Sequence, residues 1–379
     1  MSKKVVLFGN TAESLVNFRG SLLESIVNSG NEVYAISPAC ETKQKTALKN
    51  IGVNHIEISF DRTGMNVFSD LVLIYSIYMT LKKIKPESLI TYALKPIFYG
   101  SLAARFLKIQ HFPMLVGLGY TAGYTFSEDS KTFLKGYLLW PLISFFYKFS
   151  LKFSKKIFVY NQDIESFFTE KKLIKEKEKV ILVNGSGVDC DHFNVSSHPS
   201  QLSFLLIARL LSDKGLMEYV AAAKFLKAKY PQVKFKIVGF IDKHNPAAIS
   251  EDMLNQWITE GNIEFLGKLD DVRPAIRKSS VYVLPSYHEG IPRSVLEAMS
   301  MNRAVVTTNT FGCRETVDDG VNGFLVPIKD HEALATAMEK FILNPDLVYS
   351  MGKKSREIAV KKFSTDVVNN VILKELKLK

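Results

Sequence analysis

Short apolar runs alternate along the chain with longer stretches in which apolar residues recur every three to four positions. The runs are rich in Val, Ile, Leu and Phe, which is typical of strands that are buried on both faces. Strands are predicted at residues 5–8, 32–37, 54–58, 87–92, 113–116, 156–160, 204–208, 234–238, 263–266, 281–284, 304–308 and 323–326. Strands that alternate with helices in this way predict an α/β fold with parallel, doubly wound sheets.

Length and one polar stretch predict two domains. A chain of 379 residues is too long for one ordinary core. The polar residues 196–201 are the expected linker, which gives a first domain of residues 1–196 and a second domain that starts at residue 197. Residues 67–81 are apolar but contain Asp70, and they are too few to span a bilayer, so a buried helix is expected there.

The formal charge of +11 is concentrated in the first half. Residues 1–190 hold 24 Lys and Arg against 16 Asp and Glu, a difference of +8, whereas residues 191–379 hold 25 against 22, a difference of +3. Such a basic half could meet nucleic acid, anionic lipid or a phosphorylated substrate. The aromatic and aliphatic neighbours of the lysines favour lipid, so no nucleic-acid partner is expected.

Basic and aromatic residues interleave most densely in residues 133–156, which begin with Phe133 and end with Lys156. One interpretation is an interfacial helix, kinked or begun by Pro141, that contacts an anionic membrane surface. The other is a core helix whose lysines, Lys148 and Lys152 among them, extend from its edge into water. The basic charge of this half favours the membrane.

Neither a metal site nor a dinucleotide fingerprint is predicted. Cys40, Cys190 and Cys313 are widely spaced, which predicts no disulfide framework, no thiolate metal site and a reducing compartment. Asp189 and Asp191 form only a weak metal motif, and the first strand is not followed by G-x-G-x-x-G. No metal and no cofactor are therefore expected.

The stretch from Ser286 to Met299 carries the most chemistry. It follows a predicted strand, and Pro292 is suited to begin a helix, so the order is strand, loop, helix. Ligands of open α/β sheets bind at this junction, and the unpaired N–H groups of the helix start suit a diphosphate.

Charged residues of both signs are expected around this junction. Glu289 and Glu297 suit neutral sugar hydroxyls better than phosphates, although two ordinary solvated acids are the alternative. Arg209 and Lys214 follow another predicted strand, where Arg offers a fork for phosphate oxygens and Lys offers a point charge.

Three motifs together resemble glycosyltransferase family 4, the retaining nucleotide-sugar glycosyltransferases with the GT-B architecture. They are Arg209-x4-Lys214-Gly215, Glu289-Gly290-x-Pro292 and Glu289-x7-Glu297. The resemblance implies two Rossmann-like domains that face each other across a cleft, with the acceptor at residues 1–196 and the nucleotide-sugar donor at residues 197–363. It also implies a closing helix, about residues 364–379, that crosses back to the first domain.

The resemblance also implies roles for individual residues. Glu289, Arg209 and Lys214 are the expected catalytic residues, with Glu289 on the hydroxyls of the donor sugar and Glu297 on those of the ribose. The expected donor-binding residues are Arg209, Lys214, Gly239, Leu266, Glu289, Gly290, Ile291, Pro292, Ser294, Val295 and Glu297. The acceptor-side candidates are Arg19, Lys95, Gly119 and Tyr120. The loop at residues 117–123 lacks the histidine of many family members, and His111 is expected just before a strand.

Within this family, the chain is similar to bacterial transferases that add a second sugar to an undecaprenyl-diphosphate-linked first sugar. The expected donor is a UDP-linked N-acetylhexosamine such as N-acetylgalactosamine, for protein glycan, capsule or O-antigen assembly. The expected location is cytoplasmic, peripheral on the inner face of the plasma membrane. A GT-B sugar-nucleotide epimerase and a basic nucleic-acid-binding protein are the alternatives, and the second would need aromatic stacking platforms or a recognised domain.

Overall fold

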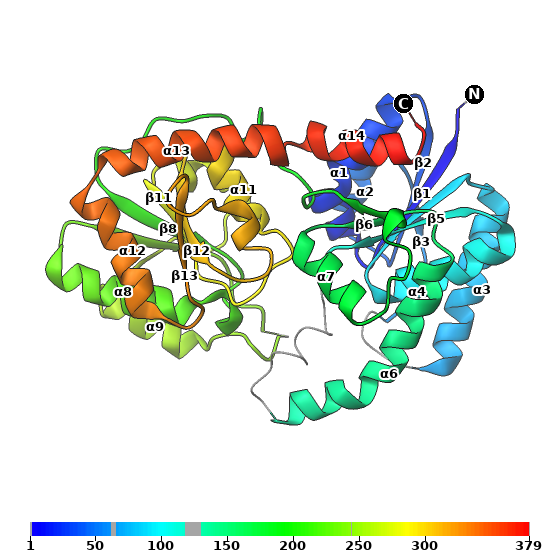
Figure 1. Cartoon of the computed structure of the whole chain (residues 1–379), viewed down its shortest axis with the longest axis horizontal. Helices are drawn as coiled ribbons and strands as arrows, with labels where there is room; N and C mark the ends of the chain where they lie inside the picture. Colours follow the sequence, from blue (N-terminus) through cyan, green and yellow to red (C-terminus); the bar gives the residue numbers. More distant parts are fainter. Residues whose placement is uncertain (1, 62–65, 118–129, 244, 379) are drawn as a thin grey trace. The chain divides into compact units, whose positions relative to one another are not determined.

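The computed structural model of the chain divides into two compact units. The first comprises residues 1–186 and 368–379, and the second comprises residues 187–367. The structure describes residues 2–61, 66–117, 130–243 and 245–378, with the backbone alone at residues 67 and 130–138. Each unit is built on one sheet of parallel strands (Figure 1).

The first unit contains a seven-stranded sheet in its described residues, in the order β3-β2-β1-β4-β5-β6-β7. The strands are β1 (Lys4–Phe8), β2 (Glu32–Ser37), β3 (Asn54–Glu57), β4 (Ser88–Tyr92), β5 (Gln110–Leu115), β6 (Ile157–Val159) and β7 (Val180–Leu182). The helices are α1 (Ala12–Asn28), α2 (Thr42–Asn50), α3 (Val67–Ile84), α4 (Leu94–Leu107), α6 (Ser130–Lys152) and α7 (Gln162–Glu170). A 3-10 turn covers Lys177–Lys179.

The described part of the second unit repeats this order with six strands, β10-β9-β8-β11-β12-β13. The strands are β8 (Ser203–Ile207), β9 (Lys234–Val238), β10 (Glu264–Phe265), β11 (Val281–Leu284), β12 (Ala304–Thr308) and β13 (Gly323–Val326). The helices are α8 (Leu216–Lys229), α9 (Glu251–Thr259), α10 (Arg273–Arg277), α11 (Arg293–Ser300), α12 (His331–Leu343) and α13 (Asp346–Ile358). Ser212–Lys214 and Arg314–Thr316 form 3-10 turns, and Ala359–Phe363 forms a π-helical turn before α14 (Thr365–Glu375).

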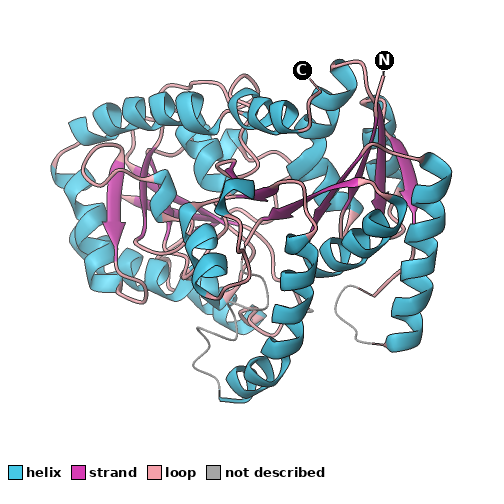
Figure 2. Cartoon of the chain, turned by 45° about the vertical axis from the view of Figure 1, so that its right-hand side comes forward, coloured by secondary structure: helices cyan, strands magenta, loops and turns pink. Residues whose placement is uncertain are grey.

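Helices cover both faces of each sheet (Figure 2). The central strands are therefore buried throughout, as in β11 and β12, where every residue is buried. This arrangement explains why the strand sequences are continuous apolar runs rather than alternating ones. The doubly wound α/β fold expected from the sequence is confirmed for both units.

The first boundary between the units lies earlier than residue 196. The N–H of Val188 donates to the carbonyl oxygen of Phe363 at 2.8 Å, and the N–H of Thr365 donates to that of Val188 at 3.0 Å. Phe193 is buried in the core of the second unit. Residues 187–196 therefore belong with the second unit, and so do residues 364–367 at the start of α14. The rest of α14 joins the first unit, where the Asn369 amide donates to the hydroxyls of Ser21 and Ser25, each at 3.0 Å.

The helix expected to be buried at residues 67–81 is buried on one face only. Leu73, Ile77 and Leu81 of α3 are in the core, whereas the opposite face is exposed and apolar. The expectation was wrong because the apolar residues of this stretch are too numerous for one face of a helix. Within the described ranges, no helix is both long enough and apolar enough to cross a membrane.

The described part of α6 packs into the first unit. Ile143, Tyr147 and Leu151 are buried, and the ring of Phe146 stacks on that of Phe98 with 4.0 Å between centroids. Lys148 and Lys152 are exposed. From residue 143 onward α6 therefore buries one face in the core and exposes Phe145, Lys148 and Lys152 on the other. The side chains of residues 133–138 lie outside the described part, and contact of this segment with a membrane stays a prediction.

Candidate functional site

The sheet order of the second unit places two loops side by side. β8 and β11 are neighbours, although β9 and β10 come between them in the chain. The connections from β8 and β11 therefore leave in opposite directions, and ligands of open α/β sheets bind at the carboxyl ends of two such strands. The loop after β8 carries Arg209 and Lys214, and the loop after β11 carries Glu289.

Close backbone contacts fix these two loops to each other. The N–H of Tyr287 and the hydroxyl of Ser286 both donate to the carbonyl oxygen of Asp213, at 2.9 and 3.1 Å. Gly215 has a φ of +71°, and a Cβ at this position would lie 2.0 Å from the carbonyl oxygen of Pro285. Only glycine allows this approach, which brings Lys214 toward Glu289.

Lys214 and Glu289 form an ion pair. The Lys214 Nζ lies 2.7 Å from Glu289 Oε1, and the side chains are only 14% and 20% exposed. Burial is the largest single influence on the pKa of Lys214 and lowers it, but the Glu289 and Asp213 carboxylates together outweigh burial and leave this pKa raised. The lysine is therefore cationic at neutral pH. A cation for phosphate and a carboxylate for hydroxyl groups thus stand together.

Asp213 is a third charged group at this point, and the sequence motifs did not single it out. Its Oδ1 is buried and has no hydrogen-bond partner in the described chain, and its Oδ2 lies 4.0 Å from His288 Nε2. Its position beside Lys214 in the sequence was the available signal. The local negative charge of the two carboxylates exceeds the charge of the one lysine.

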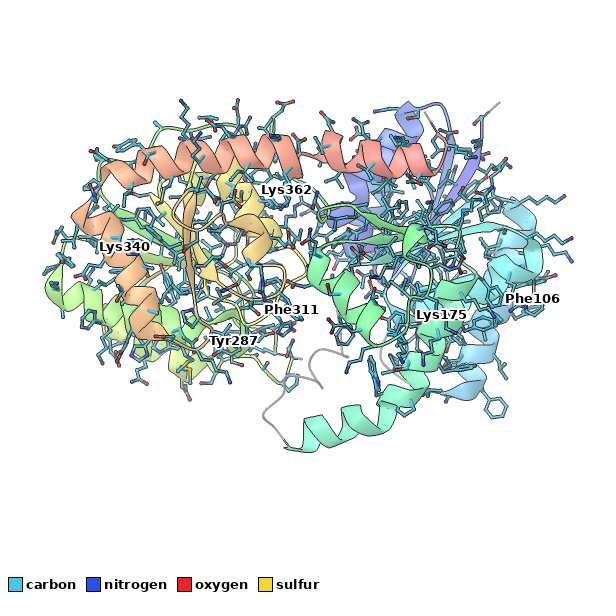
Figure 3. The ribbon with its side chains drawn as sticks, viewed as in Figure 1. Phe106, Lys175, Tyr287, Phe311, Lys340 and Lys362 are labelled. Atoms are coloured by element: carbon cyan, nitrogen blue, oxygen red, sulfur yellow. The ribbon has the colours of Figure 1, made fainter. Side chains whose placement is uncertain are left out.

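A third loop, after β12, is hydrogen-bonded to the loop that carries Glu289. The N–H of Glu289 donates to the carbonyl oxygen of Phe311 at 3.0 Å, and the Thr310 hydroxyl donates to the carbonyl oxygen of Tyr287 at 2.9 Å. Gly312 has a φ of +73°, and a Cβ there would lie 2.3 Å from the carbonyl oxygens of both Glu289 and Gly290. Tyr287 and Phe311, labelled in Figure 3, belong to these two adjoining loops.

The first turn of α11 follows directly. Pro292 is its N-cap. The N–H of Val295 donates to the Pro292 carbonyl at 3.1 Å, so this N–H is already engaged within the turn. The hydroxyl of buried Tyr282 lies 2.7 Å from Ser294 Oγ and 3.0 Å from the carbonyl oxygen of Ile207. Tyr282 therefore ties β8 and β11 to the start of α11, a role that its apolar surroundings in the sequence concealed.

Glu297 faces back along the same helix. Its Oε1 accepts a hydrogen bond from Arg293 Nε at 3.0 Å, and its side chain is 13% exposed. Burial raises the pKa of this carboxyl although Arg293 opposes the shift. Ile291, which is partly buried against the core next to Pro292, completes the predicted residues of this segment.

Arg209 pairs with an acid from another loop. Its Nη1 lies 3.0 Å from Asp242 Oδ2, and its side chain is half exposed. Gly239 and Leu266 follow β9 and β10, farther from β11 in the sheet. A Cβ on Gly239 would lie 2.0 Å from the carbonyl oxygen of Ala208, so this glycine permits close packing of two strand ends. Leu266 is 39% exposed.

In the first unit, Arg19 is an enclosed cation. It is 4% exposed, its guanidinium lies 4.7 Å from the Tyr92 ring centroid and 5.2 Å from that of Tyr160, and its Nη1 donates to the carbonyl oxygen of Phe18. Its Nε has no hydrogen-bond partner in the described residues.

The other acceptor-side candidates are less informative. Lys95 is ion-paired, with its Nζ 2.8 Å from Asp70 Oδ1 and with both side chains mostly buried. Gly119 and Tyr120 lie outside the described residues.

His111 lies within β5 rather than before it, and it is 2% exposed. Its Nε2 is 2.8 Å from Thr91 Oγ1, and its Nδ1 is 3.3 Å from Ser154 Oγ. These polar partners explain why a strand begins in a sequence that reads as polar. Burial lowers the pKa of His111 to about 3. His111 is therefore a neutral core residue.

A pH dependence of stability follows from His111. Below pH ~6.5 the unfolded chain takes up a proton at this imidazole, whereas the folded unit does so only near pH 3. We therefore expect this group to lower the free energy of unfolding by up to about 1.4 kcal/mol for each pH unit in this window. Urea unfolding between pH 7 and pH 5 measures the slope. His111→Gln should flatten it, exposed His331→Gln should not, and equal slopes for all three proteins would contradict the assignment.

Two groups bear on metal binding. Cys40 Sγ lies 4.0 Å from both His55 Nδ1 and Glu57 Oε1, the one cluster of metal-ligand types among the residues described. However, Lys45 Nζ lies 2.9 Å from Glu57 Oε1 and would repel a cation. Asp189 Oδ1 accepts the N–H groups of Asp191 and His192, at 3.0 and 2.9 Å, so it caps a turn. The absence of a metal stays a prediction.

Comparison with known proteins finds similarity to glycosyltransferases. Residues 191–358 match the model of glycosyl transferases group 1. The N,N'-diacetylbacillosaminyl-diphospho-undecaprenol alpha-1,3-N-acetylgalactosaminyltransferase of Campylobacter jejuni is 27% identical over 94% of both chains. The UDP-Gal:alpha-D-GlcNAc-diphosphoundecaprenol alpha-1,3-galactosyltransferase of Escherichia coli is 24% identical over 79% of this chain and 78% of that protein. The crystal structure of Anabaena HepE in complex with UDP superposes with a TM-score of 0.78, at 17% identity, over 99% of both chains.

The family match covers the part of the chain that carries the candidate site. The matched residues contain the Lys214–Glu289 pair and α11, and the structural likeness covers both Rossmann-like units. The expectation of a glycosyltransferase with the GT-B fold is thus confirmed, and residues 191–358 of the chain match the group 1 glycosyltransferase model.

Proposed function

We propose that the enzyme transfers a sugar from a UDP-linked donor to a saccharide carried on a polyprenyl diphosphate, with retention at the anomeric carbon. The observation that carries the proposal is the partly buried pair of Lys214 and Glu289, 2.7 Å apart, where the loops after β8 and β11 meet. The names of the two relatives, both of which act on undecaprenyl-diphosphate-linked sugars, support the class of acceptor. An N-acetylhexosamine such as N-acetylgalactosamine is the proposed sugar.

In the reaction the bond from the anomeric carbon to the diphosphate oxygen breaks, and the acceptor oxygen bonds to that carbon. Negative charge develops on the departing diphosphate, and we assign Lys214 and the first turn of α11 at Ser294 to its stabilisation. Arg209 joins them by exchanging Asp242 for a phosphate oxygen, which its half-exposed position allows. The departing phosphate accepts the proton of the acceptor hydroxyl.

Carboxylates hold the neutral parts of the donor. Glu289 accepts hydrogen bonds from sugar hydroxyls while Lys214 neutralises its charge. Glu297 keeps one carboxylate oxygen for the ribose hydroxyls, since Arg293 occupies the other. No step in this scheme uses a metal ion or a cofactor.

The first unit supplies the acceptor side of the proposal. Arg19 is buried between two tyrosine rings, and its contacts within the described residues include no carboxylate, so it suits an anionic group of the acceptor. Lys95 becomes available only if its pair with Asp70 opens. A peripheral location on the inner face of the plasma membrane belongs to the same proposal.

A panel of sugar nucleotides tests the proposal. We expect release of UDP from one UDP-sugar to accelerate when a polyprenyl-diphosphate-linked saccharide is added, with the α-anomer of the product establishing retention from an α-linked donor. A sugar-nucleotide epimerase would instead convert the donor without any acceptor, and NMR of the nucleotide product distinguishes the two. Failure of every sugar nucleotide to bind would contradict the site itself.

A further inference from the structure

Helix α3 presents an unusual apolar face to water. Along this face the exposed fractions are 83% for Phe68, 57% for Leu71, 64% for Val72, 65% for Tyr75 and 43% for Met79. The spacing of three and four positions places these five side chains, called the α3 face below, on one side of the helix. Exposed apolar side chains that are contiguous over three turns indicate a contact surface.

The charges around the α3 face are basic. Lys82, Lys83 and Lys85 at the end of the helix are exposed. The single acid of the helix, Asp70, is neutralised by Lys95, whose Nζ lies 2.8 Å from it, and the two side chains are 19% and 13% exposed. An apolar face bordered by lysines, with its one carboxylate already paired, complements an anionic lipid surface.

We propose that the α3 face docks the protein on the surface of an anionic bilayer. A second copy of the chain is a poorer occupant because it would bring a second set of lysines to the same border, where like charges repel. A lipid surface places no charged group next to Asp70, and its anionic headgroups pair with the lysines. The α3 face lies on a different helix from residues 133–156, most of which belong to α6.

If the proposed function holds, the position of α3 explains how docking would serve the transfer reaction. Its first turn is joined by the Asp70–Lys95 pair to the first turn of α4, which follows the carboxyl end of β4. α3 and α4 lie side by side (Figure 1). The Phe68 end of the face is therefore at the sheet edge where Lys95 and the acceptor are expected, so docking presents this edge to a lipid-linked saccharide.

A further large apolar side chain is exposed on the neighbouring helix. Phe106 at the end of α4, labelled in Figure 3, is 71% exposed.

Vesicle co-sedimentation of the full chain tests this inference. We expect Leu71→Ser/Tyr75→Ser to lower partitioning into phosphatidylcholine vesicles that contain phosphatidylglycerol by roughly tenfold or more, because two exposed apolar side chains lose their insertion into lipid. The matched control is Phe225→Ser/Leu343→Ser, which removes two side chains that are 60% and 69% exposed on helices of the second unit. It should leave partitioning unchanged.

Charge and oligomeric state complete the test. Lys82→Glu/Lys83→Glu should weaken binding to the anionic vesicles and change little with phosphatidylcholine alone. Equal partitioning of the wild type and the Leu71/Tyr75 variant would overturn the inference, as would a wild-type dimer that this variant converts to a monomer without any change in partitioning. A protein that docks through α3 but transfers no sugar to a lipid-linked acceptor would keep the inference and refute the proposed function.

Discussion

Replacing Lys214 by alanine is expected to reduce sugar transfer by roughly 10²- to 10³-fold, the usual cost of one preorganised electrostatic group at a developing charge. The variant removes the cation that stands 2.7 Å from Glu289, and it leaves the Glu289 and Asp213 carboxylates to face the donor diphosphate unopposed. Both the loss of attraction and the gain of repulsion raise the barrier. Steady-state release of UDP with the lipid-linked acceptor measures the effect.

Two further variants distinguish this role from a structural one. Lys229→Ala removes an ion pair of the same length, 2.7 Å, at a more exposed place in the same unit, and it should retain full turnover because such pairs contribute little. Lys214→Arg keeps the charge and should recover part of the activity. Wild-type turnover in Lys214→Ala, with thermal stability unchanged, would exclude this lysine from the reaction.

The strands were predictable wherever their sequence is continuously apolar. The runs at 281–284 and 304–308 coincide with β11 and β12, because burial on both faces leaves no polar position to confuse the pattern. At β5 the prediction began at Pro113, three residues late. Gln110 and His111 are polar, and the sequence gives no sign that Thr91 and Ser154 supply buried partners for the imidazole.

The residue types of the site could be predicted from the sequence, but the contacts between these residues could not. Lys214 and Glu289 were both expected on loops at strand ends, but their contact depends on which strands are neighbours in the sheet, and apolar runs that look alike do not encode strand order. For the same reason the sequence predicts that Arg209 binds phosphate oxygens but not that Asp242, from the loop after β9, pairs with it. Tyr282 was hidden because its ring satisfies the apolar pattern while its hydroxyl ties three elements together.

The exposed side of α3 was missed for a related reason. The apolar run predicts a helix, and the structure buries its residues Leu73, Ile77 and Leu81. An apolar residue on the outer face looks the same in sequence as one in the core. The packing of α3 against the sheet and α4 decides which residues remain in water. A functional surface made of apolar residues is therefore hard to recognise in the sequence, because the same residue types form the core.

Gly215→Ala is expected to destabilise the second unit by about 3 kcal/mol and to abolish most of the transfer activity, since alanine there meets both a disfavoured backbone and a collision. The φ of +71° alone would cost about 1 kcal/mol. The added Cβ, 2.0 Å from the carbonyl oxygen of Pro285, forces the loops after β8 and β11 apart. Separation of these loops moves Lys214 away from Glu289, so activity should fall further than stability explains.

Gly261→Ala provides the matched comparison, because Gly261 has a φ of +70° in the same unit and a Cβ added there would meet no atom within 4 Å. It should show the backbone cost alone, with turnover unchanged at a temperature where the unit is folded. Chemical unfolding and assays on the folded fraction separate the two effects. If Gly215→Ala is no worse than Gly261→Ala in both measurements, the loop after β8 is free to move, and the Lys214–Glu289 pair does not depend on the contact with Pro285.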